Sequence, residues 1–431
     1  MNPKSTLSNT DLLIIGAGPA GLAAALAAAP SGARIMVIDD NIAPGGQIWR
    51  DGPAAALPTQ ALRLREAVAR CPNVHLLCGT RVISAMGTHA LLLEDAERGW
   101  TQHFDTLILC TGGRELLLPF PGWTLPGVTG AGGLQALIKA GLLVRGERIV
   151  IAGSGPLLLA AAATARKAGA RVLRVAEQAS LGSVAAFAAQ LGRWPAKALQ
   201  ALTLADPSYR AGTQLMAVQG QHQVESVQLR QAGRTSTLPC ERVASGFGLV
   251  PNTQLGQLLG CALSTSPGGM SALKVDAMQA TSVPGVYAAG ECTGFGGAER
   301  ALAQGKIAGL AAVNQLDAAR ALWPERARWE AFASQLHRHF ALDPDLRHMP
   351  RADTLVCRCE DVSHASLSGC SGWTDAKLHS RCGMGACQGR VCGAAAQFLY
   401  GWTPPVPRPP LSPARISTLV GELADASPDT Q

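Results

Sequence analysis

The chain has 431 residues, of which 47% are hydrophobic and 16% are charged, and its formal net charge is +7. This length predicts two to four domains, and the hydrophobic content excludes a disordered chain. The positive charge is spread along the chain and only 4% of residues are aromatic, so basic blocks and base-stacking surfaces are scarce and nucleic-acid binding is not expected.

The beginning of the chain lacks the pattern of a secretion signal. Residues 1–10 are polar, and the apolar run after them contains glycines and a proline. No stretch reaches the roughly 18 unbroken apolar residues that a membrane span needs. We therefore expect a cytoplasmic protein without a transmembrane segment.

Residues 12–39 predict a dinucleotide-binding βαβ unit. A short apolar strand runs into Gly16-x-Gly18-x-x-Gly21, an Ala-rich helix follows, and a second strand ends on Asp39. The three glycines permit a tight turn, the approach of a pyrophosphate to the helix N-terminus, and close packing of helix on strand. Asp39 is then predicted to hold the ribose hydroxyls. The alternative is a glycine-rich turn without a ligand, which the acid about 20 residues later disfavours.

The next segments are typical of the FAD-binding domain of two-dinucleotide flavoproteins. The glycine pair at Gly45 and Gly46 lets backbone approach a flat ring, and Gln47 can hydrogen-bond the polar edge of that ring. Residues 74–110 read as short strands that end in the turn Thr111-Gly112-Gly113. An ordinary Pro-Gly turn and a plain linker are the alternatives. No pair of cysteines spaced by four residues follows directly after the glycine loop, and no Cys-x-x-Cys occurs further on, so the disulfide relay of related reductases is not expected.

A later segment predicts the other half of the same site. A strand ends in Gly290-Glu291, whose carboxylate can accept hydrogen bonds from the ribityl chain of FAD. A helix begins after Gly297, and its positive end is predicted to point at the isoalloxazine. The residues predicted to bind the cofactor lie in these turns: Gly16, Gly18, Pro19, Ala20, Gly21, Asp39, Asp40, Gly46, Gln47, Thr111, Gly112, Gly290, Glu291 and Gly297.

Between the two halves lies a second, degenerate βαβ unit. Its turn has Gly153 and Gly155, but Leu158 replaces the third glycine. A leucine at this contact is expected to push the helix away, and the following strand, residues 170–177, does not deliver a clean acid at the ribose position. We therefore expect the fold without nicotinamide binding. A structurally held adenine nucleotide and an empty site are the alternatives.

Six of the twelve cysteines fall between Cys357 and Cys392. Cys357 and Cys359 form one close pair and Cys387 and Cys392 another, with 27 residues between Cys359 and Cys387. Two such pairs suit a [2Fe–2S] cluster, and a four-thiolate zinc site is the alternative that the spacing leaves open. Cys370 and Cys382 remain as buried small residues or spare thiols.

At these residues a family becomes recognisable. The runs Cys357-x-Cys359-Glu-Asp-Val and Ser380-Arg-Cys-Gly-Met-Gly-x-Cys387-Gln-Gly-Arg-x-Cys392 resemble the bacterioferritin-associated-ferredoxin-like [2Fe–2S] domain. With PFPGWTLPGV, GSGPLLL and GECTGFGGAERALAQGKIAG, the chain resembles the alpha subunits of heteromeric FAD-dependent amine dehydrogenases. That group includes the A-type subunit of opine oxidase, the alpha subunits of proline and D-hydroxyproline dehydrogenases, and the B-type subunit of hydrogen cyanide synthase.

The resemblance implies a fold, cofactors and partners. The fold is α/β, with glutathione-reductase-like FAD and NAD(P)-type Rossmann domains and a small C-terminal [2Fe–2S] domain. The iron ligands are Cys357, Cys359, Cys387 and Cys392. Relatives carry an FMN at the subunit interface, and some bind ATP in the second Rossmann unit. The implied partners are a smaller, glycine-oxidase-like FAD-containing beta subunit, joined in some complexes by a small ferredoxin-like gamma subunit.

We therefore expect an electron-transfer subunit of a dehydrogenase that oxidises the C–N bond of an imino acid, amino acid or opine. Electrons would pass to a quinone, dye or carrier, which brings the protein to the periphery of the inner membrane. The alternatives are a self-contained NAD(P)H-dependent reductase, a glycine-oxidising subunit of the hydrogen cyanide synthase type, and a non-enzymatic assembly module. No carboxylate or histidine pair has the pattern of a substrate base, so no catalytic residue is predicted.

The expected domains follow from the order of these segments. They are residues 1–125, first part of the FAD domain; 126–239, inserted Rossmann domain; 240–315, second part of the FAD domain; 316–350, connector; 351–405, [2Fe–2S] domain; and 406–431, tail.

Overall fold

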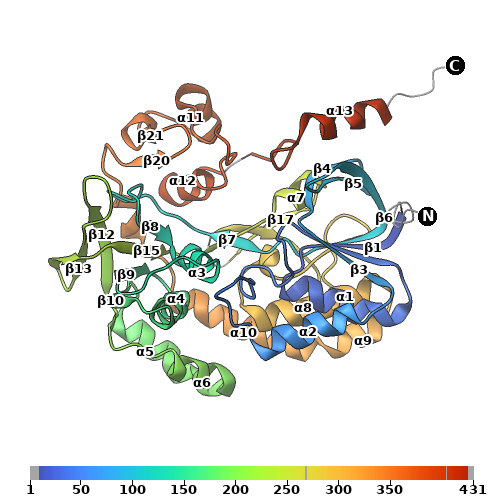
Figure 1. Cartoon of the computed structure of the whole chain (residues 1–431), viewed down its shortest axis with the longest axis horizontal. Helices are drawn as coiled ribbons and strands as arrows, with labels where there is room; N and C mark the ends of the chain where they lie inside the picture. The colour runs from blue at the N-terminus through green and yellow to red at the C-terminus, as the bar shows by residue number, and fades with distance from the viewer. Residues whose placement is uncertain (1–8, 267–268, 404, 426–431) are drawn as a thin grey trace.

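The structure is a computed structural model that describes residues 9–266, 269–403 and 405–425. Two α/β units lie side by side, a small domain of short strands and helices lies over the second unit, and the chain beyond this domain reaches the first unit (Figure 1). Among the described residues, no helix combines the length and the apolar character needed to cross a membrane. The predicted α/β class with two dinucleotide-type units is confirmed.

The first unit is built on a seven-stranded sheet with the order β3-β2-β1-β6-β5-β4, in which β19 also pairs with β6. Strands β1, β2, β3, β6 and β19 are parallel where they pair, whereas β5 is antiparallel to β6 and β4 is antiparallel to β5. The strands are β1 (Asn9–Ile15), β2 (Ile35–Asp39), β3 (Val74–Cys78), β4 (Arg81–Ala85), β5 (Ala90–Glu94), β6 (Gly99–Leu109) and β19 (Val286–Ala288).

Three helices cover one face of this sheet: α1 (Pro19–Ala28), α2 (Thr59–Ala69) and α8 (Ala298–Ala312) (Figure 1). Helices α1 and α8 pack unusually closely because glycines face backbone. A Cβ added at Gly305 would lie 2.1 Å from the Ala20 carbonyl oxygen, and one at Gly309 would lie 2.2 Å from that of Ala24. This contact joins the first segment of the domain to its last one.

The second unit has a five-stranded sheet with the order β11-β10-β9-β15-β8 and a separate three-stranded meander. Its elements are β8 (Val128–Gly130), α3 (Ala131–Lys139), β9 (Arg148–Gly153), α4 (Leu157–Lys167), β10 (Arg171–Glu177), α5 (Leu181–Gln190), α6 (Pro195–Thr203), β11 (Tyr209–Arg210), β12 (Thr213–Gln219), β13 (Ser226–Gln231), β14 (Arg234–Pro239) and β15 (Arg242–Gly246). Because β15 pairs with β8 and β9, the chain returns to the first unit after Gly246, later than the sequence pattern suggested.

The structure shows how Leu158 fits where the motif has its third glycine. The side chain is fully buried in the core beneath α4. Space for the Leu158 side chain comes from strand β15, where Gly246 has no side chain. A Cβ at Gly246 would lie 3.0 Å from Leu158 Cδ2. In the first unit the small residue is Gly21 on the helix, whereas here it is on the neighbouring strand.

The return to the first unit passes through short elements: β16 (Leu249–Pro251), which pairs with β7 (Gly113–Glu115), then α7 (Gln254–Leu258), β17 (Leu263–Thr265) and β18 (Ser271–Leu273). The connector consists of α9 (Leu316–Ala321) and α10 (Trp323–His339). The small C-terminal domain contains β20 (Leu355–Cys357), β21 (Val362–Ser363), α11 (Trp373–Ser380) and α12 (Cys392–Tyr400).

The tail returns to the first sheet. The Leu411 N–H donates to the Ile83 carbonyl at 2.6 Å, and α13 (Ile416–Asp425) begins beside β5 and β6. There the Arg415 N–H and the Thr418 hydroxyl donate to the Glu94 carboxylate at 2.9 and 2.6 Å. Residues 426–431 of the predicted tail lie outside the described residues.

The packing of Leu158 gives a stability prediction. Gly246→Val should destabilise the protein by about 1–3 kcal/mol, because the added methyl groups overlap Leu158 and Ala131 in a filled core. Leu158→Ala in the same chain should recover part of that loss, which urea unfolding of the two single variants and the double variant measures. Strictly additive effects would contradict the proposed contact.

Candidate functional site

The turn after β1 has the close contacts that the glycine motif predicts. Gly16 has φ +107°, and a Cβ there would lie 2.2 Å from the Cys110 carbonyl oxygen. A Cβ at Gly21 would lie 1.8 Å from the Gly16 oxygen. Gly18 is the N-cap of α1 and no side chain caps it, so the first N–H groups of the helix are not satisfied by a side-chain cap. Uncapped helix N-termini of this kind bind phosphate.

Asp39 and Asp40 point to different places. Asp39 is buried, its Oδ2 accepts from the Ala17 N–H at 2.6 Å, and its Oδ1 accepts from the Asn41 N–H at 2.8 Å. Its carboxylate therefore lies against the glycine turn. The Asp40 side chain is exposed and pairs with Arg81 at 3.4 Å, away from the turn.

The glycine loop lies directly on this turn. A Cβ at Gly46 would lie 3.0 Å from the Gly18 Cα, so the residue must be small. Gln47, in contrast, is exposed and its Oε1 accepts from Arg50 at 2.8 Å. The structure therefore brings Gly46 to the site but directs the Gln47 amide to the surface.

The second half-site meets the first through small residues. Gly290 has φ +82°, and a Cβ there would lie 2.9 Å from the Ala20 Cβ at the start of α1. Pro19 occupies the first position of that helix. The Gly290 N–H donates to Gln304 Oε1 at 3.0 Å, which fixes the turn before Glu291. The two segments, about 270 positions apart, thus form one site.

Glu291 has a free acceptor inside the protein. Its Oε1 accepts from the Gly297 N–H at 3.2 Å, whereas its Oε2 is buried and has no partner. Burial raises the pKa of the Glu291 carboxyl, and the Gly297 N–H and the Arg300 guanidinium partly offset that rise. A buried, unpartnered oxygen is satisfied by a ligand hydroxyl, as the ribityl chain of FAD provides.

The turn from Thr111 to Gly113 completes the wall beside Glu291. The Thr111 hydroxyl donates to the Asn252 carbonyl at 2.6 Å, and the Asn252 amide donates back to the Thr111 carbonyl at 2.9 Å. Gly112 has φ +67° and open space in place of a side chain. Asn252 was missed from the sequence, because nothing near it in the chain marks a partner 141 positions away.

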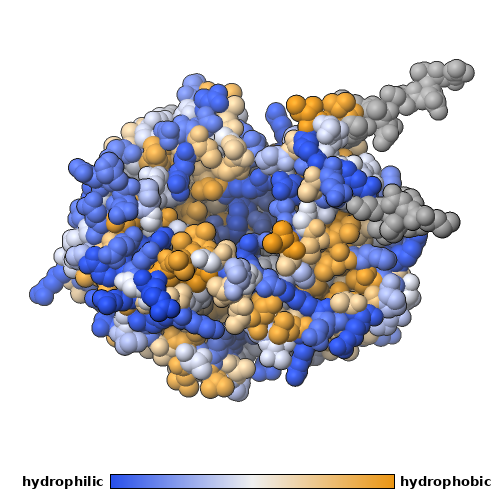
Figure 2. All heavy atoms as spheres, viewed as in Figure 1, coloured by the Kyte–Doolittle hydropathy of each residue, from blue (hydrophilic) through white to orange (hydrophobic). Residues whose placement is uncertain are grey.

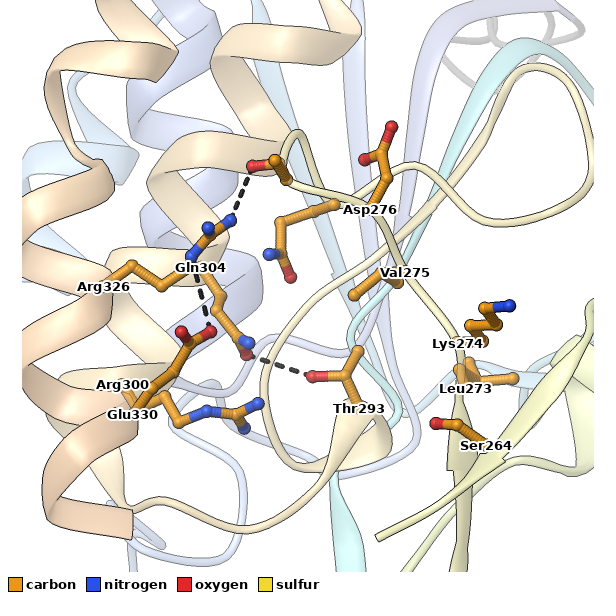
Figure 3. Close-up of a pocket in the computed structure, with 12 residues that line it drawn as sticks. Ser264, Leu273, Lys274, Val275, Asp276, Thr293, Arg300, Gln304, Arg326 and Glu330 are labelled. Atoms are coloured by element: carbon orange, nitrogen blue, oxygen red, sulfur yellow. Dashed lines mark hydrogen bonds and ion pairs between the residues drawn. The ribbon is translucent and has the colours of Figure 1, made fainter. Parts of the chain in front are cut away.

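A polar cavity of 410 Å³ lies behind the turn that carries Glu291. Figure 3 shows Thr293 and Gln304 on one side, with Arg326 and Glu330 of α10 beside them and Asp276 opposite. Arg326 Nη1 donates to the Ala277 carbonyl at 2.6 Å and its Nε pairs with Glu330 at 3.4 Å. The cavity also borders Arg300, so the positive charge that acts on Glu291 lies at its wall.

The second dinucleotide turn contains an acid after all, so that expectation was wrong. Glu177 ends β10, is fully buried, and accepts from the Gly155 N–H at 2.7 Å and the Ala179 N–H at 2.8 Å. Its place matches that of Asp39 in the first unit. Burial raises the pKa of Glu177 to about 7, against the effect of these N–H donors.

This second turn is covered by the chain itself. The Ser154 hydroxyl donates to the Phe340 carbonyl at 2.9 Å, and the Gln178 amide donates to the Ala341 carbonyl at 2.8 Å. A Cβ at Gly155 would lie 3.9 Å from that of Phe340. Gly155 is consequently buried, whereas its counterpart Gly18 is only half-buried.

Five cysteines converge in the C-terminal domain. The Sγ atoms of Cys357, Cys382 and Cys392 all lie within 4.8 Å of one another, and all three residues are buried. Cys359 is exposed and Cys387 half-buried, and their thiols are hydrogen-bonded to each other. Hydrogen bonds from the Cys392 thiol and from backbone N–H groups lower the pKa of Cys387 to about 4. Thiolates grouped in this way fit a metal or iron–sulfur centre.

The cysteine group adjoins the site around Glu291. A Cβ at Gly113 would lie 3.6 Å from the Glu291 Cβ, and the next residue, Arg114, donates through Nε to the Arg390 carbonyl at 3.0 Å. Arg390 lies between Cys387 and Cys392. Arg114 was also missed from the sequence, although a charged residue directly after a buried strand and a glycine turn was the available signal.

Known proteins resemble this chain in sequence. The family model of pyridine nucleotide-disulphide oxidoreductases matches residues 10–308. The A-type subunit of opine oxidase from Rhizobium meliloti (strain 1021) is 32% identical, over 97% of this chain and 99% of its own length. The HcnB subunit of hydrogen cyanide synthase from Pseudomonas protegens is also 32% identical, over 94% of this chain and 96% of its own length.

Solved structures agree on the fold. L-proline dehydrogenase from P. horikoshii superposes with a TM-score of 0.67 at 18% identity, over 95% of this chain and 79% of its own. Thioredoxin reductase from T. acidophilum has a TM-score of 0.54 at 22% identity, over 72% of this chain and 99% of its own. The chain belongs to the pyridine nucleotide-disulphide oxidoreductase family, is related to HcnB and to the A-type subunit of opine oxidase, and is an oxidoreductase.

Proposed function

We propose that this chain is the electron-transfer subunit of a heteromeric dehydrogenase that oxidises a C–N bond. In this proposal the first unit binds FAD and Cys357, Cys359, Cys387 and Cys392 bind a [2Fe–2S] cluster. When bound, these groups supply the electron chemistry, and the protein supplies their positions and surroundings. A partner subunit would oxidise an imino acid, amino acid or opine, with D-hydroxyproline, proline or an opine as first candidates.

The observation that carries this proposal is the shared wall between the two candidate cofactor sites. Gly113 touches Glu291, and Arg114 binds the loop between Cys387 and Cys392. A flavin beside Glu291 and a cluster on those cysteines would therefore be separated by little more than one strand. Close placement of two redox groups favours electron transfer between them over substrate chemistry at either one.

The residues of the first unit suit FAD in particular. The uncapped N-terminus of α1 supplies N–H groups for the pyrophosphate, and Asp39 is positioned for the ribose. Helix α8 begins after Gly297, its N-cap, also without a side-chain cap, and its positive end favours negative charge on a bound flavin. The unpartnered Glu291 Oε2 accepts one more donor.

Two observations support a partner subunit. The opine oxidase relative and HcnB are both named as subunits of larger enzymes. In addition, Ile48, Leu137 and Leu143 are 53%, 45% and 86% exposed on the glycine loop, on α3 and just after α3. Figure 2 shows orange groups gathered around α3 on this face. Lys139 donates to the Ile48 carbonyl at 3.4 Å, so these segments are neighbours. A smaller FAD-containing beta subunit is our proposed occupant.

The family itself favours one other function, reduction of the flavin by NAD(P)H. The covered second turn argues against this function. The Ser154 hydroxyl and the Gln178 amide already donate hydrogen bonds to the Phe340 and Ala341 carbonyls, and Gly155 is buried. The segment at Phe340 and Ala341 also favours a second unit without a bound nucleotide over one that binds ATP. The similarity to HcnB keeps glycine as a further candidate substrate of the complex.

The FAD site is tested by Asp39→Ala. Loss of this carboxylate should weaken FAD binding by about 2–4 kcal/mol, because charged hydrogen bonds contribute roughly 1.5–3 kcal/mol each. Flavin occupancy after gel filtration measures the effect. Asp40→Ala is the matched control and should keep most of its flavin, since that side chain pairs with Arg81 at the surface. Equal occupancy in both variants would show that Asp39 has no part in the site.

The covered second turn is tested with reduced nicotinamides. Anaerobic mixing with NADH or NADPH should leave the flavin absorbance unchanged on the timescale of turnover, while dithionite bleaches it fully. Rapid bleaching by either nucleotide would make the NAD(P)H-dependent reductase the correct function.

The division of labour between subunits is tested by comparing the lone chain with a co-purified pair. The beta candidate is a glycine-oxidase-like FAD protein encoded beside this chain. Assays with an artificial acceptor should include D-hydroxyproline, proline, opines and glycine. The lone chain should oxidise none of them, and the pair should oxidise one. Activity of the lone chain equal to that of the pair would refute the proposal, and glycine as the preferred substrate would select the hydrogen cyanide synthase type.

A further inference from the structure

Cys382 lies among the proposed iron ligands although it belongs to neither cysteine pair. It sits two residues after α11, in the loop before α12, and its side chain is fully buried. Its Sγ lies within 4.8 Å of both Cys357 Sγ and Cys392 Sγ. The Cys382 thiol is hydrogen-bonded to both of these thiols.

The three sulfur atoms lie close to the separation at which two thiolates share one metal ion. A metal–sulfur bond is about 2.3 Å long, so two thiolates on one ion lie no more than about 4.6 Å apart. The spread of the three Sγ atoms, at most 4.8 Å, nearly satisfies this limit before any side chain moves. Water cannot compete at this place, because Cys357, Cys382 and Cys392 are all at most 1% exposed.

The other two proposed iron ligands, Cys359 and Cys387, are not grouped with an additional cysteine in the described residues. Within the described part of the chain, no group of three possible ligands at that spacing includes Cys359 or Cys387. Both are free thiols, and they are hydrogen-bonded to each other at the more exposed edge. Gly385 also holds Cys359 in place, since a Cβ there would lie 2.2 Å from the Cys359 Cβ.

The loop around Cys382 permits a small movement of its thiol. Arg381 ends α11 with φ +64°, and Gly383 follows with φ +79°. The Cys382 N–H donates to the Ser380 hydroxyl at 3.3 Å, which is a long hydrogen bond. A rotation about the Cys382 side chain is therefore enough to direct its sulfur toward either neighbour.

We propose that Cys382 is a reserve ligand, which replaces Cys357 or Cys392 on the iron that these two residues share. This inference rests on the proposed [2Fe–2S] site. The exchange is a ligand substitution without a change of oxidation state. The iron–sulfur bond to Cys357 or Cys392 breaks, a bond to Cys382 forms, and the proton of the Cys382 thiol passes to the departing thiolate.

The test is a set of alanine variants of the full chain, each measured for iron per chain and for the electron paramagnetic resonance signal of the reduced cluster. Cys357→Ala and Cys392→Ala should each keep at least half of the wild-type iron, with a shifted signal. Cys382→Ala should keep both iron and signal unchanged. Cys387→Ala and Cys359→Ala should lose more than nine-tenths of the iron, and so should Cys357→Ala/Cys382→Ala and Cys392→Ala/Cys382→Ala.

The outcomes separate this inference from the one it rests on. Wild-type protein that binds zinc or no metal under anaerobic conditions refutes the cluster itself. Iron-loaded wild type with Cys357→Ala and Cys392→Ala as iron-poor as Cys387→Ala refutes the reserve role alone. Iron loss in Cys382→Ala would show that Cys382 is a permanent ligand, and this result would also refute the reserve role. Thermal melting followed by circular dichroism checks that each variant is folded. If either Cys357→Ala or Cys392→Ala does not fold, the iron content of the other variant tests the reserve role.

Discussion

The whole arrangement depends on a strand of three residues, β7, whose members contact three different parts of the molecule. Gly113 lies against Glu291, Arg114 donates to the Arg390 carbonyl of the cysteine loop, and Glu115 accepts from the Gly132 and Gly133 N–H groups at 2.7 and 2.8 Å. Burial lowers the pKa of Arg114 to about 10, so the guanidinium still carries its charge at neutral pH. A partly buried cation needs all of its acceptors, because loss of one leaves charge without compensation. The carbonyls of Pro251 and Arg390 and the Asn252 amide oxygen are thus tied to one side chain.

The two dinucleotide-type units show how one fold can keep or close a site. Both have a glycine turn, a helix behind it and an acid at the end of the next strand. In the first, the turn at Gly18 is only half-buried and the helix carries the small residue, Gly21. In the second, the small residue is Gly246 on the strand, and the segment at Phe340 lies over Gly155. Helix packing is preserved in both, so the difference concerns access and not the fold.

The sequence was sufficient for features that depend on neighbours in the chain. Gly16, Gly21 and Gly46 make the close contacts that their motifs require, because the steric need is local. Cys357 and Cys392, which belong to two separate pairs in the sequence, lie close together in the structure. Features that depend on distant partners were not foreseen. Phe340 meets Ser154 across 186 positions, and no pattern near either residue indicates the contact. Gly246 could not be matched to Leu158 without knowledge that β15 enters the second sheet.

The last stretch of the chain gives the C-terminal domain a second anchor. The connector enters the domain on one side, and on the other the chain runs back to the first sheet, where Leu411 pairs with Ile83 and Arg415 and Thr418 bind Glu94. Arg390 also reaches the Leu411 carbonyl. A module held at both ends does not swing outward like a carrier on a flexible tether. In the proposed function, an electron acceptor would therefore have to come to the domain, and the edge with the exposed Cys359 is the place of approach that we propose.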